Sequence, residues 1–80
     1  MVSATFHFHQ ELNDFLALHQ RGKEFVVACP GDATVKHMIE ALGIPHTEVG
    51  AIEINGGAAG FDRRLQEGGR AGGYPENGSA

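Results

Sequence analysis

The best-defined segment of this chain reads TVKHMIEALGIPHTEVGAIEINGG and runs from Thr34 to Gly57. Its first apolar residues recur at i, i+3, i+4 and i+7, which places them on one face of a helix; they are Val35, Met38, Ile39 and Leu42. Thr34 suits the N-cap, because its hydroxyl can accept a hydrogen bond from a free amide of the first turn. Gly43 favours the left-handed conformation after the last turn, and Pro45 blocks continuation. The pattern predicts one helix over residues 34–42.

A strand and a tight turn follow this helix. Ile52 and Ile54 alternate with other residues, which predicts a strand over Ala51–Ile54 with one buried face. Asn55-Gly56 is typical of a two-residue hairpin turn, because both positions need a positive φ. Farther along, Phe61 and Leu65 stand alone in a polar segment, and we expect them to anchor a loop to the core.

Two more strands are predicted before the helix. From Val2 to His9 the residues alternate with a period of two, which indicates a half-buried strand with Phe6 and Phe8 on the core side. The apolar residues that follow Glu24 predict a second strand over Glu24–Cys29. Pro30 and Gly31 end this strand. The segment between these strands, residues 10–22, predicts a short helical turn and then a loop.

The final third of the chain is rich in glycine, with eight of the twelve glycines after residue 55. A last strand is expected from Arg70 to Tyr74, although it contains Gly72 and Gly73. Each glycine in a strand costs about 0.5–1 kcal/mol relative to alanine. The sequence therefore predicts a weak last strand and leaves open whether a partner protein supports it. Residues 1–75 are predicted to form one domain and residues 76–80 a flexible tail.

The order strand, strand, helix, strand, strand is that of a β-grasp. A helix with a single apolar face needs to be covered by only one face of a sheet. The sequence therefore predicts an α+β protein with a ubiquitin-like β-grasp fold, in which a mixed four-stranded sheet packs on one main helix.

Composition limits the classes of partner. The chain has 80 residues, a formal net charge of −4 and only six lysines and arginines, which disfavours direct contact with nucleic acid. Arg63, Arg64 and Arg70 lie close in sequence and are interpreted as a solvated turn. No apolar run approaches the roughly 18 residues of a membrane span, and no secretory signal is recognised. With Cys29 as its one cysteine, the chain is expected to be cytoplasmic.

No group of residues predicts catalysis. His7 and His9 point to one face of their strand and could bind zinc or copper, but a structural zinc site usually needs four ligands. They are interpreted as part of a solvated face. Cys29 is interpreted as a small residue that ends a strand, because a reactive thiolate needs a base or a helix N-terminus close by. We predict no catalytic, cofactor-binding or metal-binding residues, no cofactor and no enzymatic activity.

Several segments resemble one family. They are ATFHFHQELNDFL (Ala4–Leu16), TVKHMIEALGIPHTEV (Thr34–Val49), INGG (Ile54–Gly57) and FDRRLQEGGR (Phe61–Arg70), followed by Tyr74-Pro75. They are similar to the ubiquitin-like domain of the Mut-seven C-terminal ribonuclease proteins, bacterial proteins in which this domain precedes a PIN-type nuclease domain. The acidic metal ligands of that nuclease have no counterpart in these 80 residues, so nuclease activity is not expected. More distantly, the chain resembles the ThiS/MoaD-like sulfur carriers.

The resemblance implies three functional hypotheses. The first is a non-enzymatic protein-interaction module, or the small subunit of a larger assembly, which binds a protein through its sheet face or an edge strand. The second is a sulfur carrier or protein modifier that acts through Gly72-Gly73. Such proteins end in Gly-Gly, so the seven residues from Tyr74 to Ala80 would first have to be removed. The third is an accessory to an RNA-processing nuclease.

Overall fold

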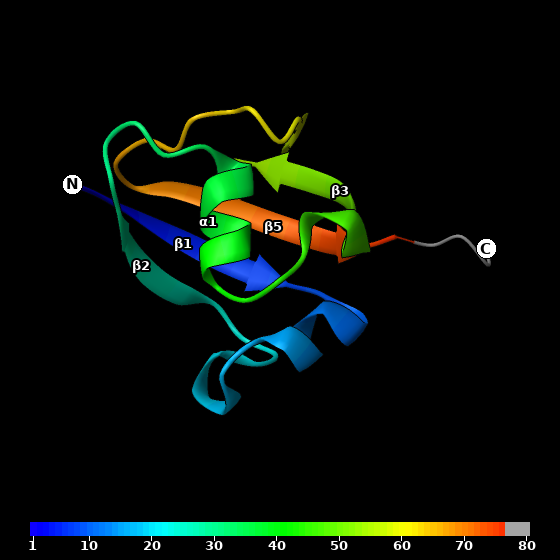
Figure 1. Ribbon diagram of the computed structural model, residues 1–80. Coiled ribbons are helices and arrows are strands. Elements are labelled where there is room, and N and C mark those ends of the chain that lie inside the picture. The colour runs from blue at the N-terminus through cyan, green and yellow to red at the C-terminus, as the bar shows by residue number, and fades with distance from the viewer. Residues whose placement is uncertain (77–80) are drawn as a thin grey trace.

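The computed structural model describes residues 1–76, in which one α-helix lies across one face of a mixed five-stranded sheet (Figure 1). The strand order is β2-β1-β5-β3-β4. The strands are β1 (Val2–Phe8), β2 (Phe25–Cys29), β3 (Val49–Ile54), β4 (Gly57–Ala59) and β5 (Gly69–Pro75). The first and last strands are parallel neighbours, and every other pair is antiparallel. This is the predicted α+β, ubiquitin-like β-grasp.

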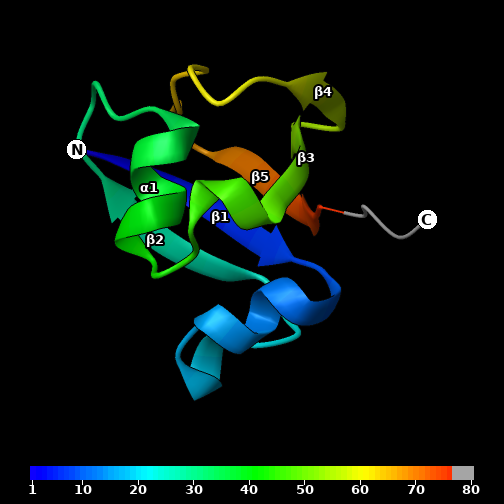
Figure 2. The same ribbon diagram turned by 45° about the vertical axis from the view of Figure 1, so that its right-hand side comes forward.

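The sheet has five strands rather than the four predicted, because the Asn55-Gly56 turn is followed by the short strand β4. Both turn residues have positive φ, +51° and +85°, as a two-residue hairpin requires. The turn pairs Ile54 with Gly57 and returns the chain along β3 (Figure 2). The segment Gly57–Ala59 contains no β-branched or aromatic residue, so its composition carried no strand signal.

The helix α1 spans Val35–Ala41, slightly shorter than predicted. Thr34 is its N-cap, and its Oγ1 accepts a hydrogen bond from the His37 amide at 3.2 Å. Gly43, just past the end, has a φ of +104°. The loop before β5 is fixed to the start of this helix, because the Val35 amide donates to the Arg63 carbonyl at 2.8 Å. Leu65 is buried and Phe61 is half-buried against the core, which confirms both as anchors of that loop.

The connection between β1 and β2 forms two 3₁₀ turns, η1 (Gln10–Phe15) and η2 (Leu18–Gln20). Asn13 holds this connection together. Its Nδ2 donates to the carbonyls of Phe8 and Gln10, both at 3.0 Å, and its Oδ1 accepts from the Gly22 amide at 2.8 Å. A third turn, η3 (His46–Glu48), leads into β3. Within residues 1–76, no helix has the length and apolar character needed to cross a membrane.

The core lies between α1 and the inner face of the sheet. Its largest fully buried side chains are Phe6, Phe8, Leu12, Ile39, Ile44 and Val35. The glycines of β5 do not leave this strand unsupported, because β1 pairs with residues 69–73 and β3 with residues 71–75. Strands of the same chain therefore pair with β5 on both sides, and support of this strand by a partner protein stays a hypothesis.

Candidate functional site

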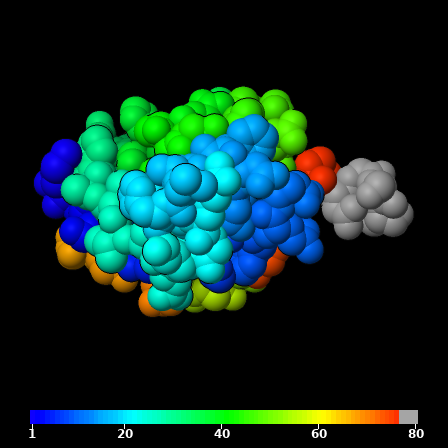
Figure 3. Space-filling view, turned by 90° about the horizontal axis from the view of Figure 1, so that it is seen from below, coloured from blue at the N-terminus to red at the C-terminus, as the bar shows by residue number. Residues whose placement is uncertain are grey.

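The outer face of the sheet, on the side away from α1, is the candidate functional surface. In the view from below Figure 1, green atoms of α1 and η3 lie along the upper side, orange atoms of β5 and yellow-green atoms of β3 lie along the lower side, and the connection between β1 and β2 lies in front (Figure 3). Strand alternation turns a defined set of side chains to this outer face. The set consists of Thr5, His7, His9, Glu24, Val26, Glu53, Arg70 and Tyr74, and we call this surface the open face.

A hollow of about 150 Å³ lies in the open face. The sheet register places His7 of β1, Gly72 of β5 and Glu53 of β3 in one row across three strands. Gly72 has no side chain, so the space between His7 and Glu53 is left open above it. The hollow continues toward Thr5, Glu24 and Arg70 in one direction and toward His9 in the other.

Three rings line one side of the open face. The centroids of His7 and His9 are 4.5 Å apart, and His9 stacks on Tyr74 at 4.2 Å with an interplanar angle of 1°. The Tyr74 hydroxyl donates to Oε1 of Glu53 at 3.1 Å, and this bond to a carboxylate raises the pKa of the phenol. The pKa of His9 is lowered by partial burial and then by the charge of His7, while Glu53 opposes the shift.

The predicted group of three arginines separates in space. Arg63 and Arg64 lie exposed in the loop between β4 and β5, in agreement with a solvated turn. Arg70 instead lies on β5 and forms an ion pair with Glu24 beside β2. Its backbone is held by Asn55, whose Oδ1 accepts from the Arg70 amide at 2.9 Å. Arg70 therefore belongs to the open face rather than to a turn.

The two glycines of the diglycine point to opposite faces of the sheet. Gly73 is buried under Phe8, and a Cβ at this position would lie 2.9 Å from Cδ1 of that ring. Its carbonyl accepts a hydrogen bond from the His9 amide at 3.1 Å. Gly72 faces outward, where a Cβ would meet only the His7 carbonyl oxygen at 3.4 Å. Gly73 is thus required by core packing, whereas Gly72 leaves space for the hollow.

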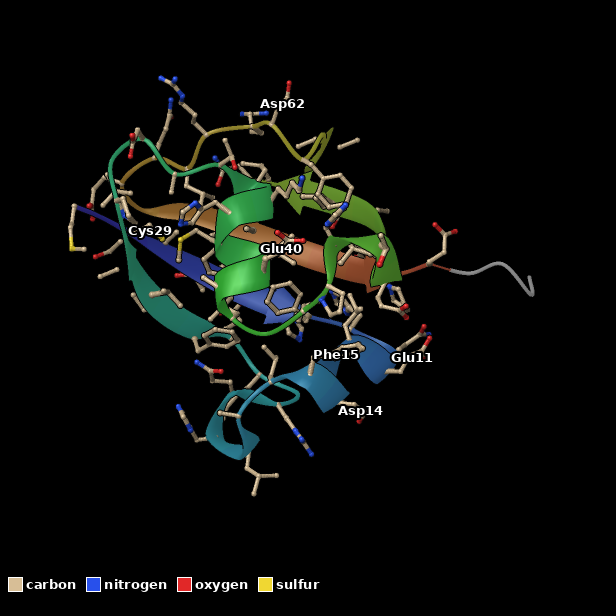
Figure 4. The ribbon with its side chains drawn as sticks, viewed as in Figure 1. Glu11, Asp14, Phe15, Cys29, Glu40 and Asp62 are labelled. Carbon is tan, nitrogen blue, oxygen red and sulfur yellow. The ribbon has the colours of Figure 1, made fainter. Side chains whose placement is uncertain are left out.

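Other candidates from the sequence do not form a reactive site. Cys29 ends β2 with its side chain turned into the core, as expected, and burial raises the pKa of its thiol (Figure 4). His7 and His9 lie together, but residues 1–76 hold no group of three or more side chains that could bind a metal. Asp62 lies at the top of the view and Asp14 lies on η1 at the lower right, and both are exposed (Figure 4). That no residue has a catalytic, cofactor-binding or metal-binding role stays a prediction.

Sequence reasoning identified the two histidines but missed Glu53, Arg70 and Tyr74. The alternation of β5 would have placed Arg70, Gly72 and Tyr74 on one face, since they are two residues apart. What was missing is the position of β5 between β1 and β3, since the pairing with β1 joins residues such as His7 and Gly72 from opposite ends of the sequence. The hollow exists only through that pairing.

Solved structures of two archaeal proteins have a similar architecture. The chain is similar to small archaeal modifier protein 1 from Haloferax volcanii, with a TM-score of 0.70, 19% identity, and coverage of 94% of this chain and 98% of that one. It is also similar to the proposed molybdopterin converting factor subunit 1 from Pyrococcus furiosus, with a TM-score of 0.68 and the same identity and coverage. At 19% identity these likenesses show the fold. No curated protein matches the chain.

The resemblance inferred from the sequence is confirmed by a family model. The model described as Mut7-C ubiquitin matches residues 1–80, and the chain therefore belongs to the Mut7-C ubiquitin family.

Proposed function

We propose that this protein is a ubiquitin-like interaction module, without catalytic activity of its own, that binds a protein partner through the open face. The observation that carries the proposal is the hollow above Gly72, which lies in the outer face of the sheet. Strand pairing fixes the backbone of this surface, so little conformational entropy would be lost on binding.

The composition of the open face supports a protein partner. Val26 is 69% exposed on one side of the hollow, and Tyr74 is 36% exposed on the other. Arg70 adds a guanidinium group to the lining of the hollow. Tyrosine and arginine are enriched at protein interfaces, where aromatic anchors combine with polar groups around them.

Capture of the partner by matched variants tests the proposal. The tagged protein, Gly72→Thr and Gly31→Thr are each used to purify bound proteins from the protein's own cells. Gly72→Thr fills the hollow, whereas Gly31 lies in an exposed loop with no atom within 4 Å of a new Cβ. We expect the same partner with wild type and Gly31→Thr, and about tenfold less or none with Gly72→Thr. Equal recovery with all three proteins would contradict binding at the open face.

A carrier or modifier role through Gly72-Gly73 is the second candidate. It is motivated by the names of the two archaeal proteins, since the likeness itself extends only to the fold. It requires cleavage after Gly73 and release of a residue whose carbonyl is bonded to His9 and whose Cα lies under Phe8. Intact-mass analysis after co-expression with an activating enzyme tests this role. A chain that still ends at Ala80 would rule it out.

An accessory role beside an RNA-processing nuclease differs from the first proposal only in the identity of the partner. The net charge of −4 favours docking onto the nuclease over contact with RNA. Recovery of a nuclease in the capture experiment, lost with Gly72→Thr, would support this version.

A further inference from the structure

We propose that the hollow above Gly72 binds a basic side chain of the partner protein, with arginine preferred to lysine. This inference rests on the proposed function and adds the chemistry of the group that the open face recognises.

The shape of the hollow fits one long side chain. His7 and Glu53 lie in the same row on strands that are separated by β5, so their backbones are about 10 Å apart. Gly72 lies between them without a side chain. A volume of about 150 Å³ is large enough for one extended arginine or lysine side chain. The partner would therefore insert a single side chain.

The charge of the hollow selects a cation. Its lining contains Glu24, Glu53 and Arg70, with a formal sum of −1 when the histidines are neutral. Arg70 is paired with Glu24, so Glu53 is the carboxylate without a cationic partner in the lining. Its Oε1 accepts the Tyr74 hydroxyl, and within residues 1–76 no hydrogen bond is made to Oε2. An anion would meet this carboxylate, and an apolar side chain would desolvate it without compensation.

The rings favour arginine. A guanidinium group is planar and weakly hydrated, so it stacks on aromatic faces while it donates to a carboxylate. His7 and His9 both line the hollow, and Glu53 lies opposite them across Gly72. Partial burial and then the charge of His7 lower the pKa of His9, which disfavours the charged form of this ring beside an incoming cation. The ammonium group of lysine can make the ion pair but not the stacking contact.

Small-molecule probes test the site without knowledge of the partner. N-acetyl-arginine amide is titrated into the full chain, and the Gly72 amide and the ring signals of His7 and His9 are followed by NMR. N-acetyl-citrulline amide has nearly the same shape without the charge. We expect weak, saturable shifts with arginine amide, with affinity at least fivefold lower for lysine amide and no saturation with citrulline amide.

Variants locate the binding. Glu53→Gln keeps an acceptor for Tyr74 and should lower the affinity about tenfold, as expected for the loss of a charged hydrogen bond. Gly72→Val should abolish binding while it leaves the circular dichroism spectrum unchanged. Glu48→Gln is the control, because it removes the same charge from η3 on the helix side of the sheet. We expect its affinity to equal that of wild type.

Each outcome has a distinct meaning. Equal shifts with arginine and citrulline amides, or equal affinities for wild type and Glu53→Gln, would overturn the inference. If the probes fail while partner capture still depends on Gly72, the open face binds proteins by other contacts and only this inference is wrong. If capture does not depend on Gly72, the proposed function itself fails.

Discussion

Gly72 and Gly73 are neighbours in sequence with different physical roles. Because a Cβ on Gly73 would press against the Phe8 ring, we expect Gly73→Ala to destabilise the protein by about 1–3 kcal/mol through overpacking. Gly72→Ala meets only an ordinary contact and should stabilise the strand by up to about 1 kcal/mol. Urea unfolding monitored by circular dichroism measures both values. Equal changes in the free energy of unfolding at the two positions would contradict the placement of Gly73 in the core and Gly72 on the surface.

His9 gives the open face a pH-dependent signal. Partial burial first, and the charge of His7 second, hold its pKa below the ordinary value of 6.5, against the opposing effect of Glu53. We predict that its ring titrates below 6.5 in an NMR pH series and that His7→Asn moves the midpoint upward. Tyr74 stacks on the ring and stays neutral throughout this range.

The sign of the effect on stability follows from this pKa. The unfolded chain binds a proton at His9 more readily than the folded chain does. Above pH 6.5 this difference does not change the free energy of unfolding. The contribution of His9 to the free energy of unfolding declines as the pH falls from 6.5 to the lower pKa of the folded state, and it is constant below that pKa. Compared with wild type, His9→Asn should therefore lose less stability across this interval, and a greater loss would contradict the assignment.

At the level of elements, the start of α1 depends on one hydroxyl. Thr34 Oγ1 caps the His37 amide in a helix of only seven residues, so Thr34→Ala should cost about 1 kcal/mol in the free energy of unfolding. Thr34→Ser keeps the cap and serves as the control. Urea denaturation of the three proteins measures the difference, and equal midpoints for alanine and serine would show that the cap contributes little.

Elements whose signal is local could be predicted from the sequence. The helix after Thr34 and the hairpin turn at Asn55-Gly56 depend on residues within a few positions, and both agree with the structure. The strand β4 could not be predicted, since its residues have no strand preference and pair only because the turn places them beside β3. Asn13 gave no signal either, because its bonds join the end of β1 to Gly22 across a turn.

The open face could be predicted only in part. Alternation placed His7 and His9 together, and the structure confirms it. Their contact with Tyr74 and the row through Gly72 to Glu53 depend on the central position of β5, which no local pattern encodes. From the sequence of β5 alone, the glycines predict a weak strand. In the paired sheet, Gly73 makes room for the Phe8 ring and Gly72 leaves the hollow open.

For the whole molecule, the pairing of β5 within the chain predicts independent folding. The isolated protein should unfold in one cooperative transition, with an enthalpy of roughly 55 kcal/mol if it follows the usual value per residue. Differential scanning calorimetry measures this enthalpy and compares it with the van't Hoff value. A broad unfolding transition that becomes cooperative only with a bound partner would show that the last strand needs that partner to fold.

The inner face of the sheet contributes to stability, and the outer face is available for binding. The inner face packs on α1, so substitutions there change stability, whereas the outward row of His7, Gly72 and Glu53 is free to contact another protein. Interaction through this row is the central claim for the molecule. NMR shift mapping of the labelled protein with its captured and purified partner tests it most directly. The account predicts the largest changes at the amides of His7, Gly72, Glu53 and Tyr74, with small changes along α1. Changes concentrated on α1 and η3, with the open face unaffected, would contradict it.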